Sequence, residues 1–566
     1  MSTAINTDVN KGSQRKRTHK RLTVGSLPLL HDIAQRMKLR EILSRYIPRH
    51  GNERVHPVDT LLLLIYNLAL GKAPLYELEH WCGSLDLQRL EITPHSTVWN
   101  DDRFGYVLDK LYRADRASLM TELVESYVAA FQLHLLQLHN DSTTVKAFGK
   151  IPGKTTSGLE LKYGKSKDHR DDLKQLVFNL SLTADGGVPV HHRCYPGNYT
   201  DDKTHIQTWN TLRAISGRAD FLYVGDSKVC TDHQLHTIVS SGGRVVTVVP
   251  ETWKEVTEFK EHLRRGCKLK KIIWRRTRPG SECEKEYFSV FAGNHTTRKR
   301  GYRIHWIYSS EKRKRDRCVR EESLRKTEAE LTDLNARLNT RHLTTRKAIR
   351  QAVNQVLRKY RVETFVSYSI SMHAITYRKQ VGKGRPSKNT RHREEKEKSF
   401  SLSWGRDRMT LRNETRIDGI FPLLCTDGNL GPAKVLKVYK YQPRLEKRFT
   451  QFKSIHNAAP LLFKKIDRVE ANMFAFFIAL AMQALLERQV RKNMTRKQID
   501  KLYIYPEDRE CAKPTASIIF DRFENTSKYQ ISEDGAVVEA YRDKLSASQM
   551  EILKIFRMKK AAYWGD

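Results

Sequence analysis

The spacing of apolar positions changes along the chain and divides it into regions. From Leu27 to about Phe131 the apolar residues recur at helical spacing, as in Ile33, Met37 and Ile42. After Leu133 they come in short runs, and helical stretches separate the later runs. Short apolar runs followed by alternating helices and strands are typical of an α/β sheet. The pattern predicts a helical N-terminal domain over residues 26–131, for DNA-end binding or for assembly, and an α/β domain from residue 132.

Two of the predicted strands end at an aspartate. Leu135, Leu136 and Leu138 lead into Asp141, and residues 221–224 lead into Asp226. The other predicted elements of this domain are strands at 176–182, 188–193 and 244–249 and a helix near 202–216. Strand ends can meet at one edge of a sheet, so the two carboxylates are candidates for a shared site.

The pattern changes again between about residues 250 and 413. Predicted short strands at 271–274, 286–292 and 302–308 precede two helical stretches and a polar loop over 382–398. We therefore expect a β-rich and helical insertion. The complete expected division is a basic flexible arm (1–25), the helical domain (26–131), a first catalytic part (132–250), a basic insertion (251–413), a second catalytic part (414–500) and a C-terminal region (501–566).

Charge narrows the function classes. The 566 residues include 102 Lys and Arg against 64 Asp and Glu, and 102 − 64 gives a net charge of +38. Such an excess favours a polyanionic partner, with nucleic acid the first candidate. The first 25 residues lack the apolar core of a secretory signal, and the longest apolar runs are too short to cross a bilayer. We expect no membrane partner.

Cysteine usage excludes two further classes of protein. The eight cysteines are scattered without a CxxC pair, which is typical of reduced cytoplasmic thiols and not of a disulfide or zinc framework. His191, His192 and Cys194 lie close together in sequence. Their place after Val188 and Val190 favours strand positions over a metal site.

A third acid is Glu446, on a predicted helix that begins near Pro443. Lys453 follows Glu446 by seven residues, about two helical turns, and so shares its face, while Phe449 and Phe452 are predicted to point to the core. Clustered carboxylates need cations to stay ionised together, and hard divalent ions take such oxygen ligands. Two Mg²⁺ ions would suit phosphodiester chemistry.

Each of these features has an alternative interpretation that the residues leave open. Strand-end aspartates often bind turn backbone, and Glu470, at the start of the apolar helix 473–486, is a rival ligand to Glu446. Arg385, in Gly384-Arg385-Pro386, is a candidate for insertion into a minor groove, against a simple solvated loop. The arm fits either a phosphate contact or a solvated tail.

Several motifs together resemble insertion-sequence transposases of the DDE class, in the branch with a tyrosine-arginine-glutamate-lysine signature. The matching stretches are residues 140–144, Tyr163-Gly164-Lys165-Ser166-Lys167-Asp168 with 170–172, 187–190, Pro196-Gly197-Asn198 through Asp201, 224–228, and Asn100-Asp101-Asp102-Arg103 in the helical start. Tyr439, Glu446 and Lys453 fall at the spacing of the signature. The sequence departs from it at Gln442, where the family has arginine, with Arg444 nearby.

The resemblance implies a ribonuclease-H-like α/β catalytic domain that holds Mg²⁺, with Mn²⁺ as a substitute. It implies Asp141, Asp226 and Glu446 as catalytic metal ligands. The DNA-binding candidates beside them are Tyr439, Lys453, Arg444, Lys228 and Arg385. The expected partners are double-stranded DNA, as element ends and target, and further copies of the chain in a homodimer or higher synaptic assembly.

The resemblance also implies Mg²⁺-dependent cleavage at element ends and strand transfer into target DNA, in a prokaryotic cytoplasm at the nucleoid. Some relatives hold a flipped base on an aromatic side chain, for which Trp274, Trp306 and Trp404 are candidates, with core packing as the alternative role. Two other functions share the charge and the fold: a catalytically inactive or repurposed DNA-binding protein, and a stand-alone metal-dependent nuclease.

Overall fold

The computed structural model shows a mixed α/β chain whose contacts divide it into two units. One unit comprises residues 1–246 and 438–566, and the other comprises residues 247–437. The structure describes all residues except 1–16, 95–98, 149–150, 166–169, 201–203, 267–269, 278–284, 341, 386–387, 389, 456–462, 506, 508 and 534–535. Most of the basic arm, Ser166 to Asp168 of the sequence motif, Asp201 and Pro386 therefore lie outside the described residues.

The first unit begins with the predicted helical region. Its helices are α1 (Leu27–Arg36), α2 (Leu39–Tyr46), α3 (Pro57–Leu70), α4 (Leu78–Gly83), α5 (Asp101–Arg113) and α6 (Arg116–Phe131), with short 3₁₀ turns at Leu75–Glu77 and Leu87–Leu90. Asn100 and Asp115 cap α5 and α6 by accepting backbone N–H groups. Helix α3 is buried along nearly its whole length, as its apolar sequence predicts.

A mixed sheet follows, with strand order β4-β3-β2-β5-β6 within this unit. The strands are β2 (Gln137–Lys146), β3 (Gln175–Thr183), β4 (Pro189–Pro196), β5 (Leu222–Val224) and β6 (Arg244–Val248). β2, β3 and β4 pair antiparallel, whereas β5 pairs parallel with β2 and with β6. Helices α7 (His205–Ser216) and α8 (Asp232–Ser240) make the two crossovers, with a 3₁₀ turn at Ser227–Val229 between β5 and α8.

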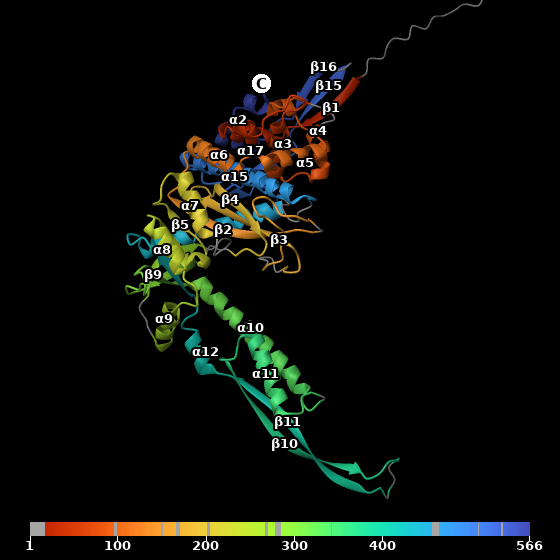
Figure 1. Cartoon of the computed structure of the whole chain (residues 1–566), viewed down its shortest axis with the longest axis vertical. Helices are drawn as coiled ribbons and strands as arrows, with labels where there is room; N and C mark the ends of the chain where they lie inside the picture. Colours follow the sequence, from red (N-terminus) through yellow and green to blue (C-terminus); the bar gives the residue numbers. More distant parts are fainter. Residues whose placement is uncertain are drawn as a thin grey trace, which may run out of the picture. The chain divides into compact units, whose positions relative to one another are not determined.

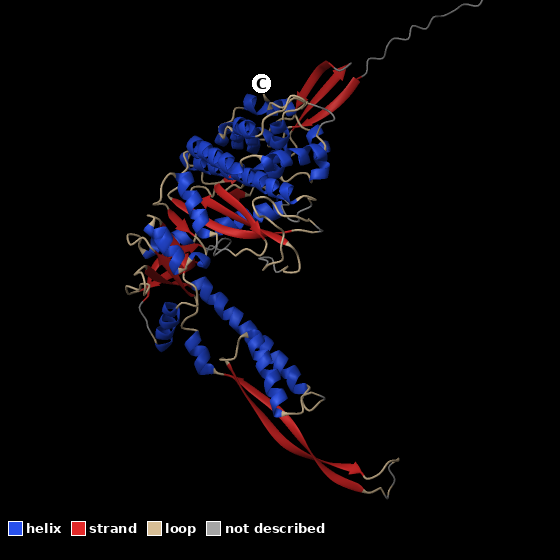
Figure 2. Ribbon diagram, in the orientation of Figure 1, coloured by secondary structure: helices blue, strands red, loops and turns tan. Residues whose placement is uncertain are grey.

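Helix α15 (Ile466–Arg496) forms the core of the first unit. It packs between the sheet, at β4, and the N-terminal helices α1, α3 and α5 (Figures 1 and 2). It is long and apolar enough to cross a membrane, but 94% of its most apolar window is buried inside the protein. His192 of β4 lies against Phe474 and Phe477 of this helix. The predicted buried helix is confirmed, and His192 contributes to packing.

The two ends of the described chain meet in a small sheet. Strand β1 (Arg17–Thr23), which falls inside the expected flexible arm, pairs antiparallel with β15 (Ser527–Glu533), and β15 pairs with β16 (Ala536–Arg542). The remaining C-terminal elements are β13 (Leu502–Tyr503), β14 (Glu510–Cys511), α16 (Ala516–Phe523), α17 (Ala547–Phe556) and α18 (Lys560–Trp564). Tyr563 donates a hydrogen bond to the carbonyl of Gly25 at 2.7 Å, so the C-terminal region is part of the N-terminal fold.

The second unit contains four further strands of the large mixed sheet and several helices. Its strands run in the order β12-β9-β8-β7, with bounds Ile420–Cys425, Arg303–Ser309, Lys285–Phe291 and Lys270–Thr277. Helix α9 (Lys254–Arg265) precedes this sheet, and α12 (Arg408–Glu414) precedes β12. The long helices α10 (Ser310–Ala336) and α11 (Arg346–Tyr360) pack together through Leu324, Leu331, Ile349 and Val353, as their spacing predicts.

A long two-stranded ribbon completes the second unit. β10 (Val366–Gln380) pairs antiparallel with β11 (His392–Arg406) over fifteen residues in each strand. The prediction of a polar loop over residues 382–398 is wrong for 392–398, which belong to β11. The sequence Arg-Glu-Glu-Lys-Glu-Lys from Arg393 lacks an apolar alternation, so pairing with β10 and not burial makes it a strand.

Candidate active site

Parallel pairing of β2 with β5 places the two aspartates at neighbouring positions of adjacent strands, although Asp141 does not end its strand as the sequence predicts, because β2 continues to Lys146 through its pairing with β3. His139 of β2 lies opposite Val224 of β5, and Asp141 and Asp226 each follow two residues later. Asp141 accepts a hydrogen bond from the backbone N–H of Ser142 at 2.7 Å. Asp226 caps the 3₁₀ turn after β5 by accepting the backbone N–H of Lys228 at 3.0 Å. The sequence-based expectation that both acids share one sheet edge agrees with this register.

Glu446 comes to the same place on helix α14 (Pro443–Thr450), which packs against β2. Tyr439, the last residue of α13 (Pro432–Tyr439), lies within electrostatic range of all three acids. Burial, followed by the charges of Asp226, Asp141 and Glu446, raises the pKa of its hydroxyl to about 12. All three carboxylates therefore act on one protonated phenol, although these residues come from three separate parts of the sequence.

The donor set is suited to hard divalent cations. Three carboxylates around one point supply the oxygen ligands that Mg²⁺ takes, and they need positive charge to remain ionised together. Among the described residues, no three His, Cys, Asp or Glu side chains already lie close enough to bind a single ion. The electrostatic effect on Tyr439 acts over a longer distance than coordination, so the three acids affect Tyr439 without already lying close enough together to bind one ion.

His205 of α7 supports Asp226 from the protein interior. The ring is buried, with 2% of its side chain exposed, and its Nε2 lies 3.6 Å from Oδ1 of Asp226. Nδ1 lies 2.9 Å from the hydroxyl of Tyr223, which fixes the plane of the ring. Histidine side chains in such positions orient acidic ligands in metal sites. The sequence analysis did not single out His205, although a histidine at the start of the predicted crossover helix was visible.

Gln442, which stands where the signature has arginine, joins α14 to the strand of Asp141. Its Nε2 donates to the carbonyl of Asn140 at 3.1 Å, and its Oε1 lies 3.0 Å from Nδ1 of His139. Burial lowers the pKa of His139 to about 4, so the ring is neutral at neutral pH, and a proton on Nδ1 suits Gln442. Gln137 donates to the other ring nitrogen at 2.8 Å. Gln442 therefore holds Glu446 and Asp141 in a fixed relation.

Arg448 fixes the inner face of the same helix. Its side chain is 6% exposed and pairs at 2.9 Å with Glu487 of α15, which is 4% exposed. It also donates to the carbonyl of Gly187 in the β3–β4 turn at 3.2 Å. Leu445, Arg448, Phe449 and Phe452 form one buried stripe, so an arginine within an apolar face was a signal in the sequence for a buried partner.

Glu470, the rival acid, is bound by a different set of residues. Both of its oxygens accept from the hydroxyl of Ser157, at 2.9 and 2.8 Å, and Arg116 of α6 lies 3.0 Å away. Glu470 is not among the groups that affect Tyr439. These contacts favour Glu446 as the third acid.

The remaining predicted residues have separate environments. Lys228 is exposed beside Asp226, and the guanidinium of Arg444 lies 5.5 Å from the ring centre of Tyr441. Lys453 lies in a π-helical turn (Gln451–Ile455) that follows α14, so the regular two-turn spacing from Glu446 is interrupted. Arg385 is exposed in the second unit.

The tryptophans considered for holding a flipped base are packing residues in the second unit. Trp306 is 2% exposed and stacks on Phe259 with ring centres 3.9 Å apart. Trp274 is half-buried and stacks on Phe288 at 5.2 Å. Trp404 packs against the α10–α11 cluster. The alternative role, core or sheet packing, describes all three.

Two motif glycines allow a close backbone contact near β3. A Cβ atom on Gly164 would lie 2.1 Å from the carbonyl oxygen of Gly197, and one on Gly197 would lie 2.2 Å from that of Gln175. Such distances are impossible for any side chain, so both positions require glycine. The structure thus gives a physical reason for two of the motifs that carry the sequence resemblance.

Comparisons with known proteins give limited matches. Residues 19–125, most of the helical N-terminal region, match a domain of unknown function (DUF4277). No curated protein matches the chain. Among solved structures, a cryo-EM structure of a piggyBac transposase synaptic complex with hairpin DNA is similar at 10% identity and a TM-score of 0.33, over 84% of this chain and 77% of that one.

Proposed function

We propose that this protein is a DNA transposase that cuts the ends of an insertion element and joins them to target DNA. The observation that carries the proposal is the placement of Asp141 and Asp226 on adjacent parallel strands, with the helix of Glu446 packed against β2. The sheet, with three antiparallel strands followed by two parallel ones, supports a ribonuclease-H-like catalytic domain. The sequence motifs support a transposase over other enzymes of that fold, and the net charge of +38 supports a DNA substrate.

In this proposal the three carboxylates hold divalent cations, Mg²⁺ or Mn²⁺. When bound, the ions activate the attacking oxygen and stabilise the leaving oxygen of the phosphodiester. His205 orients Asp226, and Gln442 and Arg448 hold the helix of Glu446 in place. Tyr439, protonated at neutral pH, supplies a neutral donor among the acids. Because two element ends must be paired, we propose that the protein acts as a homodimer or a larger assembly.

The test is cleavage of a plasmid that carries the DNA flanking the gene, in Mg²⁺ and in Mn²⁺. Wild type is expected to cut at both element ends and to join them to a second plasmid. Asp226→Asn and Glu446→Gln should each reduce cleavage by at least about a thousandfold, because they remove a metal ligand that stabilises the transition state by several kcal/mol. Glu470→Gln is the matched control and should cut at nearly the wild-type rate.

The alternatives predict different results in the same assay. A repurposed DNA-binding protein would bind the flanking DNA without cutting it, and Asp226→Asn would bind equally well. A stand-alone nuclease would cut without joining. If Glu470→Gln is inactive while Glu446→Gln cuts normally, with both variants folded by circular dichroism, the assignment of the third acid is wrong.

A further inference from the structure

The ribbon of β10 and β11 has two halves with different surroundings. Its strands remain paired from Val366 opposite Arg406 to Gln380 opposite His392. Within the second unit, the ribbon continues beyond the end of the α10–α11 pair (Figure 1). The half beside the helices and the half beyond them also differ in sequence.

The near half is supported by the helices. Val366, Phe400 and Leu402 belong to the buried cluster that α10 and α11 form. Asn339, just after α10, accepts from the backbone N–H of Phe400 at 2.7 Å and donates to its carbonyl at 2.9 Å. Asn335 accepts from the N–H of Leu402 at 3.0 Å. This side-chain support ends at Phe400.

Beyond Phe400 the same face of the ribbon becomes basic. Side chains of a strand alternate between faces, so Leu402, Phe400, Lys398 and Lys396 lie on one side of β11. The first two are buried and the lysines are exposed. The face that packs on the helices therefore continues as a cationic surface once the helices end.

Basic residues outnumber acidic ones in the far half. Residues 378–393 contain seven Lys and Arg and no Asp or Glu. Lys396 and Lys398 share their face with Arg378 and with one acid, Glu394, which lies 3.9 Å from Arg378. On the opposite face Glu395 accepts from Lys379 at 3.1 Å and from Tyr377 at 3.0 Å. The lysine face and the tip therefore keep a net positive charge.

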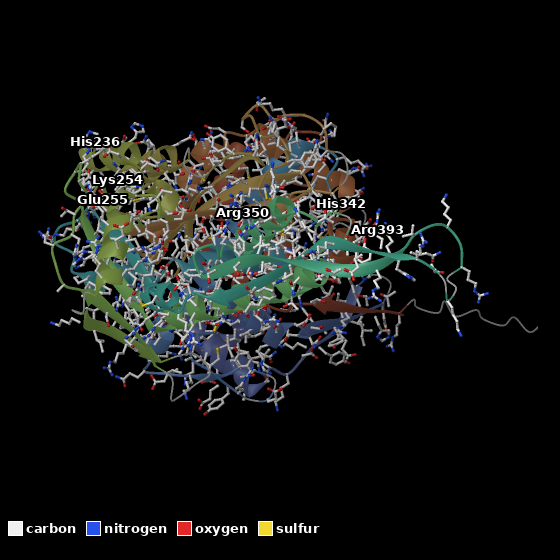
Figure 3. All side chains as sticks on the ribbon, turned by 90° about the horizontal axis from the view of Figure 1, so that it is seen from below. His236, Lys254, Glu255, His342, Arg350 and Arg393 are labelled. Atoms are coloured by element: carbon white, nitrogen blue, oxygen red, sulfur yellow. The ribbon has the colours of Figure 1, made fainter. Side chains whose placement is uncertain are left out.

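The connection between the two helices adds further basic groups at the same end of the unit. His342, Arg346, Lys347 and Arg350 are all exposed there. Figure 3 shows His342 and Arg350 on the helical pair and Arg393 farther along the ribbon. A polyanion against the lysine face would therefore also meet the cations of the helix connection.

We propose that the paired strands of the far half, residues 374–380 and 392–398, lie in the major groove of duplex DNA, with the lysine face and the tip residues Lys383 and Arg385 on the phosphates. Two strands about 4.8 Å apart fit a groove about 12 Å wide that accepts a β-ribbon. Seven residues per strand reach about 23 Å, which is enough to follow the groove over several base pairs. An isolated two-stranded hairpin is only marginally stable, so a partner along this half would also order it. The proposal rests on the proposed DNA function.

The first experiment measures the salt dependence of binding to a 30-base-pair duplex by fluorescence anisotropy, in the full-length Asp226→Asn background. The test variant replaces Lys383, Arg385, Lys396 and Lys398 with Gln. The matched control replaces the exposed Lys544, Lys554, Lys559 and Lys560 of the first unit with Gln. Each lost phosphate contact lowers the slope of log K against log salt by about 0.9, so we expect a decrease of about 3 to 4 for the test variant and less than about 1 for the control.

A second experiment identifies the groove. Methylation of guanine N7, in the major groove, should weaken binding by wild type and have less effect on the test variant. A minor-groove ligand such as distamycin should not displace wild type. Displacement by distamycin without interference from N7 methylation would overturn the major-groove assignment.

The outcomes separate this inference from the proposed function. If wild type binds no duplex DNA, both fail. If wild type binds and cuts element ends while the test variant keeps the full salt slope, only the ribbon inference fails. If the substitutions leave the slope unchanged but shift the sedimentation coefficient of the free protein, the ribbon contacts a second copy of the chain, and the DNA assignment is overturned.

Discussion

Ionisable side chains serve different purposes around helix α14 in the first unit and along the ribbon of the second. Arg448 and Glu487 are nearly inaccessible to water and bind each other, the β3–β4 turn and the start of α16. Lys396 and Lys398 on the ribbon are exposed. Buried ions are costly to leave unpaired, whereas exposed ones contribute little to folding. Charge near α14 therefore maintains the geometry of the acids, whereas charge on the ribbon is available to a partner.

The largest effect expected from this difference is on stability. Glu487→Gln leaves the guanidinium of Arg448 buried without its counter-ion, which should lower the free energy of unfolding by about 3–5 kcal/mol. Glu395→Gln, which removes a paired carboxylate from the exposed ribbon, should leave the unfolding midpoint unchanged. Urea denaturation followed by circular dichroism measures both. If both variants unfolded at the same urea concentration, the buried and the exposed charges would not differ in their contribution to stability.

A smaller effect, on cleavage and its Mg²⁺ requirement, is expected from substitutions beside Asp226. His205→Asn removes the ring that lies 3.6 Å from the carboxylate, and we expect cleavage to fall about 10- to 100-fold and to require more Mg²⁺. Tyr223→Phe, which removes only the hydroxyl that fixes the ring, should act in the same direction and more weakly. The readout is the Mg²⁺ concentration for half-maximal cleavage. An unchanged Mg²⁺ requirement in His205→Asn would show that the histidine only fills space.

The smallest expected effect is on the pH dependence of the free energy of unfolding. Burial is the main cause that lowers the pKa of His31, in α1, to about 4. The unfolded chain binds this proton near pH 6.5 and the folded chain does not, so folding is favoured above that pH and stability is lost as pH falls toward the folded pKa. The expected loss is about 1 kcal/mol between about pH 7.5 and 5.5. His31→Asn should reduce this slope, and His373→Asn on the ribbon should not; equal slopes in both variants would contradict the burial argument.

The sequence predicts those parts of the site that depend on local pattern. Asp226 follows an apolar strand, and Pro443 marks the start of the helix that carries Glu446, so both acids could be placed before the structure, whereas Asp141 lies within β2 and not at the strand end that the sequence predicts. The contacts of Gln442 could not, because its partners His139 and Asn140 lie 303 and 302 residues away in sequence. Without those partners, Gln442 looks only like a departure from the arginine of the signature.

The fold shows the same limit. The helical N-terminal region, the buried helix α15 and the strands of the first sheet follow from apolar spacing. The ribbon does not, because β11 has few apolar residues in its far half and is a strand through its partner β10. Arg448 lies between these cases: the buried stripe of α14 is visible in the sequence, but Glu487 as its partner is not.

The pairing of β1 with β15 has a consequence for the order in which the protein is made. The strand at Arg17–Thr23 is synthesised about 500 residues before its partner Ser527–Glu533. Throughout that interval the edge of β1 has no such partner, and unpaired strand edges are sites of association between chains. The same edge that closes the fold in the finished protein is therefore exposed to neighbouring nascent chains until β15 has been made.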